Sequence, residues 1–428
     1  MKILIVGGGG REHALAWHLA QSPVAHELYM APGNPGMAAL GQTLDIAVSD
    51  LTGLAIFAAR EKIDLTIVGP EGPLARGIVD HFQRAGLTIF GPSQAAARLE
   101  ADKAYAKSLM VQANVPTARY RFCNQEADAV AALADFHAPY VIKENGLAAG
   151  KGVTIAQNED EARAAIHKAF HKGMSVVIED FLRGREVSVL AICDGLCAIP
   201  MVAAQDFKKA YDGDAGPNTG GMGSYAPVPF VDDALMQRIQ REVLDPMITI
   251  LREEEGVRYR GVLYAGLMIQ HNGDPCVVEF NARFGDPETQ VILPLLESDL
   301  ADMLLCSATG DLSPYADTGF DFSGCSAVSV VLASEGYPGE VTLGATIDIP
   351  AALPPETLLF HAGTKRLPNR TIVTSGGRAL NAVGLGSNLQ EARDRAYQLA
   401  DAVNFAGKHA RRDIAANVAP APQPEHAY

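Results

Sequence analysis

The segment that decides the fold runs Val277-Val278-Glu279-Phe280-Asn281-Ala282-Arg283-Phe284-Gly285-Asp286-Pro287-Glu288-Thr289-Gln290. It begins as a short apolar run, and Glu279 and Asn281 follow two residues apart. Alternate residues of a strand share a face, so we expect their oxygens to point the same way. Mg²⁺ is usually held by one or two such ligands together with substrate phosphates. Arg283 and Gly285 then supply a planar fork for an anion and a flexible backbone. An ordinary buried strand that leaves through a polar loop has a similar sequence, so the rest of the chain is needed to decide.

The composition narrows the class of protein. A chain of 428 residues predicts two to four domains, and 48% hydrophobic with 20% charged residues is typical of a soluble globular protein. The net charge of −15 argues against a nucleic-acid partner. The six cysteines form no CxxC pair, and neither a signal peptide nor an apolar run of membrane-spanning length is present. We therefore expect a cytoplasmic protein with no membrane or nucleic-acid partner.

The periodicity of the chain changes along its length. Residues 1–101 alternate strands and helices, each strand ending at a Gly-rich turn, which predicts a doubly wound parallel sheet that binds ligands at its carboxyl edge. A second domain is expected over 102–324, with a small α+β unit inserted at about 119–187. Within it Pro246 is expected to kink a helical stretch or to begin a second helix. A mostly-β third domain with one helix is expected over 325–417, followed by a disordered tail over 418–428.

Two nucleotide motifs are incomplete. A dinucleotide fingerprint after the first strand would need glycine at position 12, where Glu12 stands. What remains is a glycine loop at a helix N-terminus, which suits a phosphate. A P-loop would need glycine in place of Asn145 and Ser or Thr in place of Gly152. The segment from Lys143 to Gly152, with Lys151 in its turn, instead suggests a mobile flap that closes over phosphates.

Together these segments resemble the ATP-grasp superfamily, and within it the glycinamide ribonucleotide synthetase family. Highly specific matches are Gly216-Pro217-Asn218-Thr219-Gly220-Gly221-Met222-Gly223 and Arg283-Phe284-Gly285-Asp286-Pro287-Glu288. Further matches span nearly the whole chain: Gly9-Gly10-Arg11-Glu12-His13-Ala14, Ala31-Pro32-Gly33-Asn34, Val68-Gly69-Pro70-Glu71, Val141-Ile142-Lys143, Gly146-Leu147-Ala148-Ala149-Gly150-Lys151-Gly152-Val153, His361-Ala362-Gly363-Thr364-Lys365 and Arg411-Arg412-Asp413-Ile414.

The resemblance implies an ATP-grasp fold and a purine-biosynthesis ligase. Such an enzyme uses ATP and Mg²⁺ or Mn²⁺ to join glycine to 5-phosphoribosylamine through glycyl phosphate. It would give glycinamide ribonucleotide, ADP and phosphate. The resemblance is also compatible with a transient contact with the preceding enzyme of the pathway.

The resemblance assigns a role to each candidate residue. The metal would lie on Glu279 and Asn281, and Arg283 and Lys143 would act in catalysis. ATP would be held by Lys103, Lys143, Lys151, Gly152, Glu179, Phe181, Leu182 and Glu186, of which Glu179, Phe181 and Leu182 frame adenine and Glu186 binds ribose. The substrates would contact Gly8, Gly9, Gly10, Arg11, Gly33, Asn34, Glu71, Asp212, Asp214, Asn218, Thr219, Gly220, Gly221, Met222, Arg283, Gly285 and Asp286. Among these, Asp212 or Asp214 would bind the ammonium of glycine. The glycines of 216–223 would bind the carboxylate of glycine through backbone N–H groups. The phosphate of the ribosylamine would be bound by Gly8–Arg11 together with Gly33-Asn34.

Four positions depart from the family pattern: Glu144 and Asn145 in the flap, and Phe207 and Ala215 near the expected substrate loop. Two alternatives remain beside the ligase. Another ATP-grasp carboxylate–amine ligase or a carboxylase would share the fold. A biotin carboxylase-like enzyme would need a carrier-domain partner and would lack the segment 216–223. A non-catalytic nucleotide-binding regulator is expected to have lost a metal ligand or a phosphate-binding lysine, whereas Glu279, Asn281 and Lys143 are all present.

Overall fold

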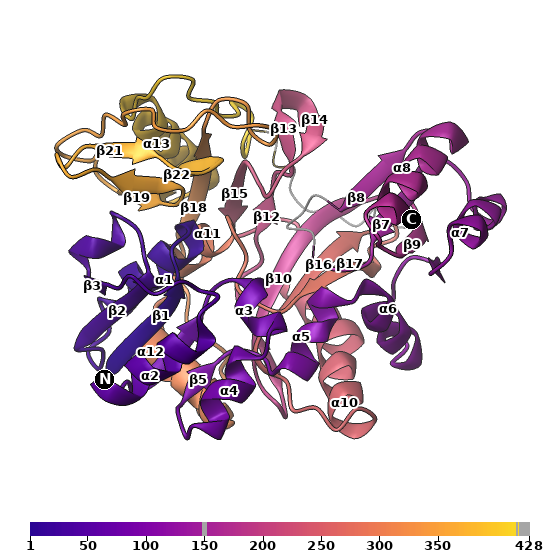
Figure 1. Ribbon diagram of the computed structural model, residues 1–428, viewed down its shortest axis with the longest axis horizontal. Helices are drawn as coiled ribbons and strands as arrows, with labels where there is room; N and C mark the ends of the chain where they lie inside the picture. Colours follow the sequence, from indigo (N-terminus) through magenta and orange to yellow (C-terminus); the bar gives the residue numbers. More distant parts are fainter. Residues whose placement is uncertain (148–151, 417, 419–428) are drawn as a thin grey trace, which may run out of the picture.

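The computed structural model describes residues 1–147, 152–416 and 418, and Figure 1 shows how its elements are arranged. The first hundred residues contain a parallel sheet of five strands in the order β3-β2-β1-β4-β5. Its strands are β1 (Lys2–Gly7), β2 (Glu27–Pro32), β3 (Gln42–Thr43), β4 (Leu65–Val68) and β5 (Ile89–Phe90). The connecting helices are α1 (Gly10–Leu19), α2 (Leu51–Glu61), α3 (Glu71–Ala75) and α4 (Ile78–Arg84).

The central strand β1 packs on both faces. Ile3 and Ile5 join the apolar cluster that contains α1, while Leu4 and Val6 join the cluster that contains α2 and α4. A strand buried on both faces is a near-continuous apolar run, as the sequence of β1 is. The doubly wound parallel sheet expected from the sequence is thereby confirmed.

The second unit along the chain, which we call the lid unit, is an antiparallel sheet in the order β6-β9-β7-β8. Its elements are β6 (Tyr120–Cys123), α7 (Glu126–Ala132), β7 (Tyr140–Glu144), β8 (Val153–Ala156), α8 (Glu159–His171) and β9 (Val176–Asp180). Ile142, Ile166 and Ile178 belong to an apolar cluster drawn from this unit alone. The unit therefore has a core of its own and stands apart from the other parts in Figure 1. Residues 148–151 of the predicted flap lie outside the described residues.

The central antiparallel sheet carries the segment quoted at the outset. Its order is β11-β10-β16-β17, from β10 (Arg185–Asp194), β11 (Ala198–Pro200), β16 (Arg260–Ile269) and β17 (Pro275–Asn281). The helices of this part are α5 (Gln94–Ala101), α6 (Lys103–Gln112), α9 (Asp233–Ile239), α10 (Asp245–Glu253), α11 (Thr289–Ile292) and α12 (Leu300–Thr309). Pro246 stands in the first turn of α10, which follows α9 without a break through the π-helical turn Gln240–Leu244, so it lies within one continuous helical run and does not begin a separate helix.

A further five-stranded sheet joins residues from distant parts of the chain. Its order is β12-β15-β18-β22-β19, from β12 (Gln205–Asp206), β15 (Gly223–Ala226), β18 (Ser326–Ala333), β22 (Arg378–Gly386) and β19 (Thr357–His361). α13 (Leu389–Ala402) packs against β18 and β22. β13 (Lys209–Tyr211) with β14 (Ala215–Asn218), and β20 (Thr364–Arg366) with β21 (Ile372–Thr374), form two-stranded sheets. The last part of the chain thus shares a sheet with β12 and β15, which the sequence did not predict, and the domain boundaries stay predictions. No helix within the described ranges has the length and apolar character needed to cross a bilayer.

Two buried histidines lie where the first and last parts of the chain meet. His13 on α1 and His361 on β19 are each 7% exposed, and the Nδ1 atom of His13 accepts a hydrogen bond from the backbone N–H of His361 at 2.8 Å. The backbone carbonyl of His361 accepts a second bond from Asn34 at 2.8 Å. Burial lowers the pKa of His13 to about 3 and that of His361 to about 4. Both rings are therefore neutral in the folded chain near neutral pH.

We predict that acid weakens this contact. Below the ordinary histidine pKa of about 6.5, these histidines bind protons in the unfolded chain but not in the folded chain. The free energy of unfolding therefore decreases as the pH is lowered, until the pH reaches the pKa values of the folded state. At pH 5 this is worth about 2 kcal/mol for each histidine. The urea midpoint of unfolding should drop between pH 7.5 and 5, and His13→Asn should flatten the decline. His271→Asn, an exposed control, should leave it unchanged. An equally steep decline in the His13 variant would contradict this explanation.

Candidate active site

A cavity of about 1150 Å³ lies between the lid unit, the central sheet and the last part of the chain. It brings together residues that are far apart in the sequence, from Arg11 to Arg411. The residues predicted for ATP, metal or substrates that line it are Arg11, Glu71, Lys103, Lys143, Gly152, Glu179, Phe181, Leu182, Glu186, Asp214, Asn218, Thr219, Gly220, Glu279, Asn281, Arg283 and Asp286.

The other predicted residues are placed elsewhere. Gly8, Gly9, Gly10, Asp212, Gly221, Met222 and Gly285 are not among the lining residues. Gly33 and Asn34 line a separate cavity of about 220 Å³. Lys151 lies outside the described residues.

Glu279 and Asn281 face the cavity from the end of β17. The register of β17 with β16 shifts between Val277 and Glu279, so Val278 is the extra residue of a β-bulge. Burial alone would raise the pKa of Glu279. The positive charges of Lys208, Lys143 and Lys103 outweigh this effect, so the pKa lies below its usual value. A carboxylate and an amide oxygen suit a hard divalent cation. Two such donors are enough for a cation that also takes phosphate oxygens. Within the described ranges no three His, Cys, Asp or Glu side chains form a metal-binding group.

Lysines surround this end of the cavity. Lys143 on β7 is 4% exposed, donates a hydrogen bond to the carbonyl of Val278 at 2.8 Å and lies 3.0 Å from Glu179 Oε1. Lys107 pairs with the other oxygen of Glu179 at 2.9 Å, and burial lowers its pKa to about 8. Lys103 donates to the carbonyl of Gly146 at 2.7 Å, and burial lowers its pKa too. Glu179, expected beside adenine, therefore holds two lysines with its carboxylate.

The side of the cavity formed by the lid unit is more apolar than the end that carries the lysines. Val141, Val153 and Ile155 from the lid sheet line it together with Phe181 and Leu182. Phe181 is 37% exposed, which leaves much of its ring free to contact a ligand. Such a wall suits the flat face of a nucleotide base, as expected for Phe181 and Leu182.

Arg283 is fixed between carboxylates. Its guanidinium lies 3.2 Å from Glu100 and 3.6 Å from Glu71, and it donates to Asn281 Oδ1 at 3.3 Å. Burial would lower the pKa of Arg283, but Glu100 and Glu71 raise it. Burial raises the pKa of Glu100, whose carboxylate also accepts the N–H of Ala282 at 2.8 Å. The arginine thus remains charged and has few orientations open to it.

The predicted glycine-rich substrate loop has little free backbone. The N–H groups of Thr219 and Met222 donate to the backbone carbonyls of Lys208 and Phe207. The N–H of Gly220 donates to the Tyr337 hydroxyl, and the N–H of Gly221 donates to the Thr219 hydroxyl. Binding of a carboxylate by these groups therefore stays a prediction that would require rearrangement.

The two acids expected to bind the ammonium of glycine have other partners. Asp212 accepts the N–H of Arg412 at 2.7 Å, and Asp214 accepts the guanidinium of Arg411 at 2.9 Å. Asp212 also lies outside the cavity lining.

The N-terminal glycine turn is held from within. The carboxylate of Glu12 accepts the N–H of Gly9 and the Nε–H of Arg11, both at 2.6 Å. A side chain at Gly8 would place its Cβ 2.4 Å from the carbonyl of Gly33, so the two turns pack backbone against backbone. Asn34 donates to Gly8 at 3.1 Å and accepts the N–H groups of Gly36 and Met37. Of the predicted residues in these turns, Arg11 alone lines the main cavity.

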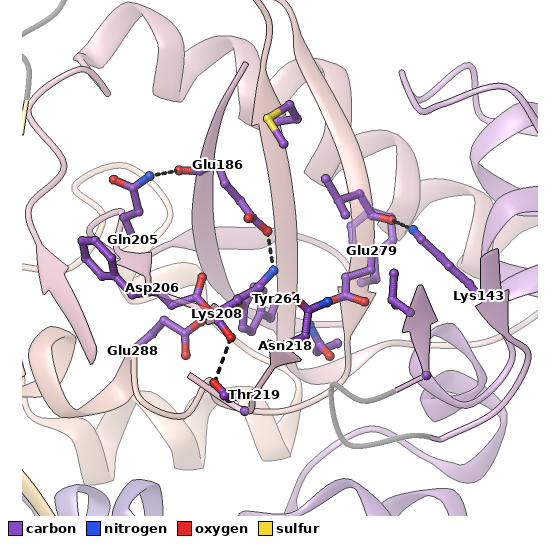
Figure 2. A pocket seen from close by; sticks show the side chains of 18 of the residues that line it. Lys143, Glu186, Gln205, Asp206, Lys208, Asn218, Thr219, Tyr264, Glu279 and Glu288 are labelled. Carbon is purple, nitrogen blue, oxygen red and sulfur yellow. Dashed lines mark hydrogen bonds and ion pairs between the residues drawn. The ribbon is translucent and has the colours of Figure 1, made fainter. Parts of the chain in front are cut away.

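The structure adds an acidic group that sequence reasoning missed. Asp206, Lys208 and Glu288 lie near Tyr264 on one side of the site, with Glu279 and Lys143 on the other (Figure 2). Lys208 pairs with Glu186, and Glu288 accepts the Tyr264 hydroxyl at 2.5 Å. The Oδ1 atom of Asp206 is buried and has no hydrogen-bond partner among the residues that the structure describes. Burial of the carboxylate, with Glu288 and Glu186 nearby, raises the pKa of Asp206 well above its usual range although Lys208 opposes this.

A signal for this group exists in the sequence. Asp206 and Lys208 are alternate residues around Phe207, and a short strand would present both on one face. Glu288 stands near the end of the segment quoted at the outset. Arg378 also lines the cavity, where it bonds the carbonyl of Asp286 at 2.7 Å, but it stands ninety residues further along the chain and carries no local signal.

Comparison with known proteins gives a consistent result. The family models for phosphoribosylglycinamide synthetase match most of the chain: the N domain over residues 1–100, the ATP-grasp (A) domain over 101–289 and the C domain over 327–417. The chain is 48% identical to a phosphoribosylamine–glycine ligase of Nostoc sp., over 97% of this chain and 99% of the relative. It is 46% identical to the Yersinia pestis ligase of the same name, over 97% and 98%.

Solved structures agree with these matches. The crystal structure of the Thermotoga maritima phosphoribosylamine–glycine ligase has a TM-score of 0.84 and 35% identity, covering 97% of this chain and 100% of that one. The biotin carboxylase domain of a Hydrogenobacter thermophilus 2-oxoglutarate carboxylase, at a TM-score of 0.73 and 15% identity over 96% and 91%, shares the fold alone. The ATP-grasp fold expected from the sequence is confirmed, and the chain belongs to the phosphoribosylglycinamide synthetase family.

Proposed function

We propose that the chain is an ATP-dependent ligase that joins glycine to 5-phosphoribosylamine and yields glycinamide ribonucleotide, ADP and phosphate. Its family membership supports this proposal, since relatives that match nearly its full length carry the name of that ligase. The observation that carries it in the structure is the meeting of Glu279 and Asn281 with Lys103, Lys143 and Arg283 on one cavity.

The reaction is a phosphoryl transfer followed by an acyl transfer. A carboxylate oxygen of glycine attacks the γ-phosphorus of ATP, the bond to the β,γ-bridging oxygen breaks, and ADP and glycyl phosphate form. The amine nitrogen of the ribosylamine then attacks the acyl carbon and expels phosphate, with loss of a proton. Such chemistry depends on alignment and charge neutralisation more than on a protein nucleophile.

The metal end of the site serves the first step. The ATP-grasp family uses ATP with a divalent metal, and we propose Mg²⁺ or Mn²⁺ at Glu279 and Asn281. A cation bound there would neutralise charge on the phosphoryl oxygens. Lys143 and Lys103 would contact phosphates from the lid side, and Arg283, held by Glu71 and Glu100, would present its fork to the transferring group.

Asp206 is our candidate for the ammonium group of glycine. Within the described part of the chain its Oδ1 atom is buried without a partner, and the carboxylates around it outnumber the one lysine, Lys208, that pairs among them. A buried carboxylate without a cation is costly, and a bound ammonium would relieve that cost. Asp212 and Asp214, the acids expected from the sequence, are occupied by Arg412 and Arg411.

Arg11 is our candidate for the phosphate of the ribosylamine, since it reaches the cavity from the N-terminal turn. Gly8, Gly10 and Gly33 would act through the shape of that turn. We further propose a cytoplasmic setting, small-molecule substrates without a nucleic-acid or membrane partner, and transient contact with the enzyme that supplies phosphoribosylamine. The six cysteines are free thiols, as a reducing compartment favours.

Release of ADP tests the overall proposal. With phosphoribosylamine generated in situ, ADP should form when glycine is present and should stay near background with alanine or serine, whose side chains add bulk beside Asp206. ADP release that requires bicarbonate would support a carboxylase instead. Tight ATP binding with no turnover under any condition would support a regulator.

Two carboxylate variants should fail in different ways. Glu279→Gln should lower kcat by about 100-fold or more and change the metal dependence, because it removes the charged donor. Asp206→Asn should raise the KM for glycine by about 10- to 100-fold, the loss expected for one charge-assisted hydrogen bond, and leave the KM for ATP nearly unchanged.

The matched control is Glu253→Gln, an exposed residue of α10 that should behave as the unaltered chain does. Thermal unfolding of all three variants checks that each is folded. Near-normal turnover in the folded Glu279 variant would mean that the metal lies elsewhere. An unchanged KM for glycine in the Asp206 variant would remove Asp206 from the glycine site.

A further inference from the structure

The β13–β14 hairpin, residues 209–218, borders the cavity but lies outside the larger sheets. Its two strands form a sheet of their own, and its tip is largely exposed, with Tyr211 at 50%. A lone two-stranded hairpin is only marginally stable in water. Its base is tied to β15, because the N–H of Phe207 donates to Gly223 and that of Met222 to Phe207. The tip requires support from another part of the chain.

Arg411 supplies much of that support. Its side chain is 1% exposed, although arginine is rarely buried to this degree. The Nη1 group donates to the carbonyl of Lys209 at 3.0 Å and to Asp214 at 2.9 Å, while Nε and Nη2 both bond Asp413 at 2.7 Å. The guanidinium also lies over the ring of Phe207, 5.0 Å from its centroid. One planar group therefore joins strand β13 and the turn of the hairpin to the last part of the chain.

The neighbours of Arg411 repeat the contact. Asp413 accepts the N–H of Gly213 at 2.8 Å, and the N–H of Arg412 donates to Asp212 at 2.7 Å. His409 donates through Nε2 to the carbonyl of Ala210 at 2.7 Å, and its ring meets Tyr211 edge to face with centroids 5.6 Å apart. We call residues 409–413 the C-terminal latch. In Figure 1 the hairpin stands beside the last, yellow part of the chain.

The latch is itself rigidly mounted. His409 pairs with Ala333 at the end of β18 through two backbone hydrogen bonds of 3.0 and 2.8 Å. The hydroxyl of Tyr397 on α13 donates to the carbonyl of Arg411 at 3.0 Å and accepts the N–H of Ile414 at 3.1 Å. Ile414 is wholly buried in the core. The C-terminal latch is therefore anchored to strand β18 and helix α13 of the last part of the chain.

We propose that Arg411 is a positioning residue, and that the C-terminal latch holds the β13–β14 hairpin in the place where its inner side completes the substrate end of the cavity. Lys209, Asp214 and Asn218 of the hairpin line that cavity, as does Lys208 at its base. The part of the proposal that concerns substrates rests on the proposed function. The latch accounts for Asp212 and Asp214 as structural acids, and it gives the last part of the chain a role at the active site.

Arginine suits this position better than lysine. Its four hydrogen bonds reach three separate acceptor groups: the two oxygens of Asp413, the carboxylate of Asp214 and the carbonyl of Lys209. A lysine ammonium has three donors at one point and cannot reach all of these acceptors together. We therefore expect Arg411→Lys to keep part of the function and Arg411→Met to lose it.

The test combines kinetics with proteolysis of the full chain. Arg411→Met should raise the KM for glycine or for phosphoribosylamine about tenfold or more, with the KM for ATP changed less than twofold. Trypsin, with the cut sites located by mass spectrometry, should cleave after Lys208 and Lys209 faster than in the unaltered chain. The adjacent residue, Ala210, has no exposed surface while the hairpin is held. Arg411→Lys should fall between the two.

The matched control is Arg412→Met. The side chain of Arg412 pairs with Asp401 on the surface, and its backbone N–H still reaches Asp212. This variant should match the unaltered chain in both readouts. If Arg411→Met does not fold, the same comparison is made with Arg411→Lys.

Unchanged cleavage at Lys208 and Lys209 would overturn the latch. Equal losses for ATP and for the other substrates would also overturn it, because they indicate a general structural defect. The proteolysis result does not depend on turnover. A chain without glycine-dependent ADP release would thus refute the proposed function, while the latch would still be tested.

Discussion

A group of buried carboxylates at one end of the cavity is the constraint on which the rest of the site depends. Asp206, Glu186, Glu279 and Glu288 converge there. Lysines lower the pKa of Glu279, whereas burial beside Glu288 and Glu186 raises the pKa of Asp206 although Lys208 opposes this. Carboxylates removed from water are costly unless cations or hydrogen bonds compensate them. The fold tolerates the cost because β12, β16 and β17 fix the backbone of this region within two sheets. Such an arrangement is suited to receive cations: a divalent metal at one point and an ammonium group at another.

Two further cations of the cavity are held by acceptors of the protein itself. Lys143 is directed to Glu179 and to the carbonyl of Val278, and Arg283 to Glu71 and Glu100. The β-bulge at Val278 links two features, since it leaves Glu279 and Asn281 facing the cavity while its carbonyl meets the lid lysine. The lid unit is thereby hydrogen-bonded to the strand that carries Glu279 and Asn281. The last part of the chain acts from the opposite side, where Arg378 bonds Asp286 and Arg411 bonds the β13–β14 hairpin.

Local patterns allowed much of the fold and part of the site to be predicted. Strand periodicity placed Glu279 and Asn281 on one face, and the apolar run of β1 indicated a sheet covered on both sides. Partners that depend on tertiary packing were not accessible in this way. Nothing near Asp212 or Asp214 indicates that Arg412 and Arg411, two hundred residues away, would bond them. The occupied N–H groups of Thr219–Met222 and the second lysine on Glu179 likewise follow from how separate elements meet.

The central claim is that these carboxylates divide the work, with the metal on Glu279 and the ammonium of glycine on Asp206. A crystal structure of the chain with a non-hydrolysable ATP analogue, Mn²⁺ and glycine tests this most directly, because Mn²⁺ is identified by its anomalous scattering. The account predicts a metal about 2.0–2.2 Å from oxygens of Glu279 and Asn281 and from the analogue's phosphates, with the nitrogen of glycine in hydrogen-bond contact with Asp206. A metal bound away from β17, or glycine bound through Asp212 or Asp214 with Arg411 displaced, would contradict it.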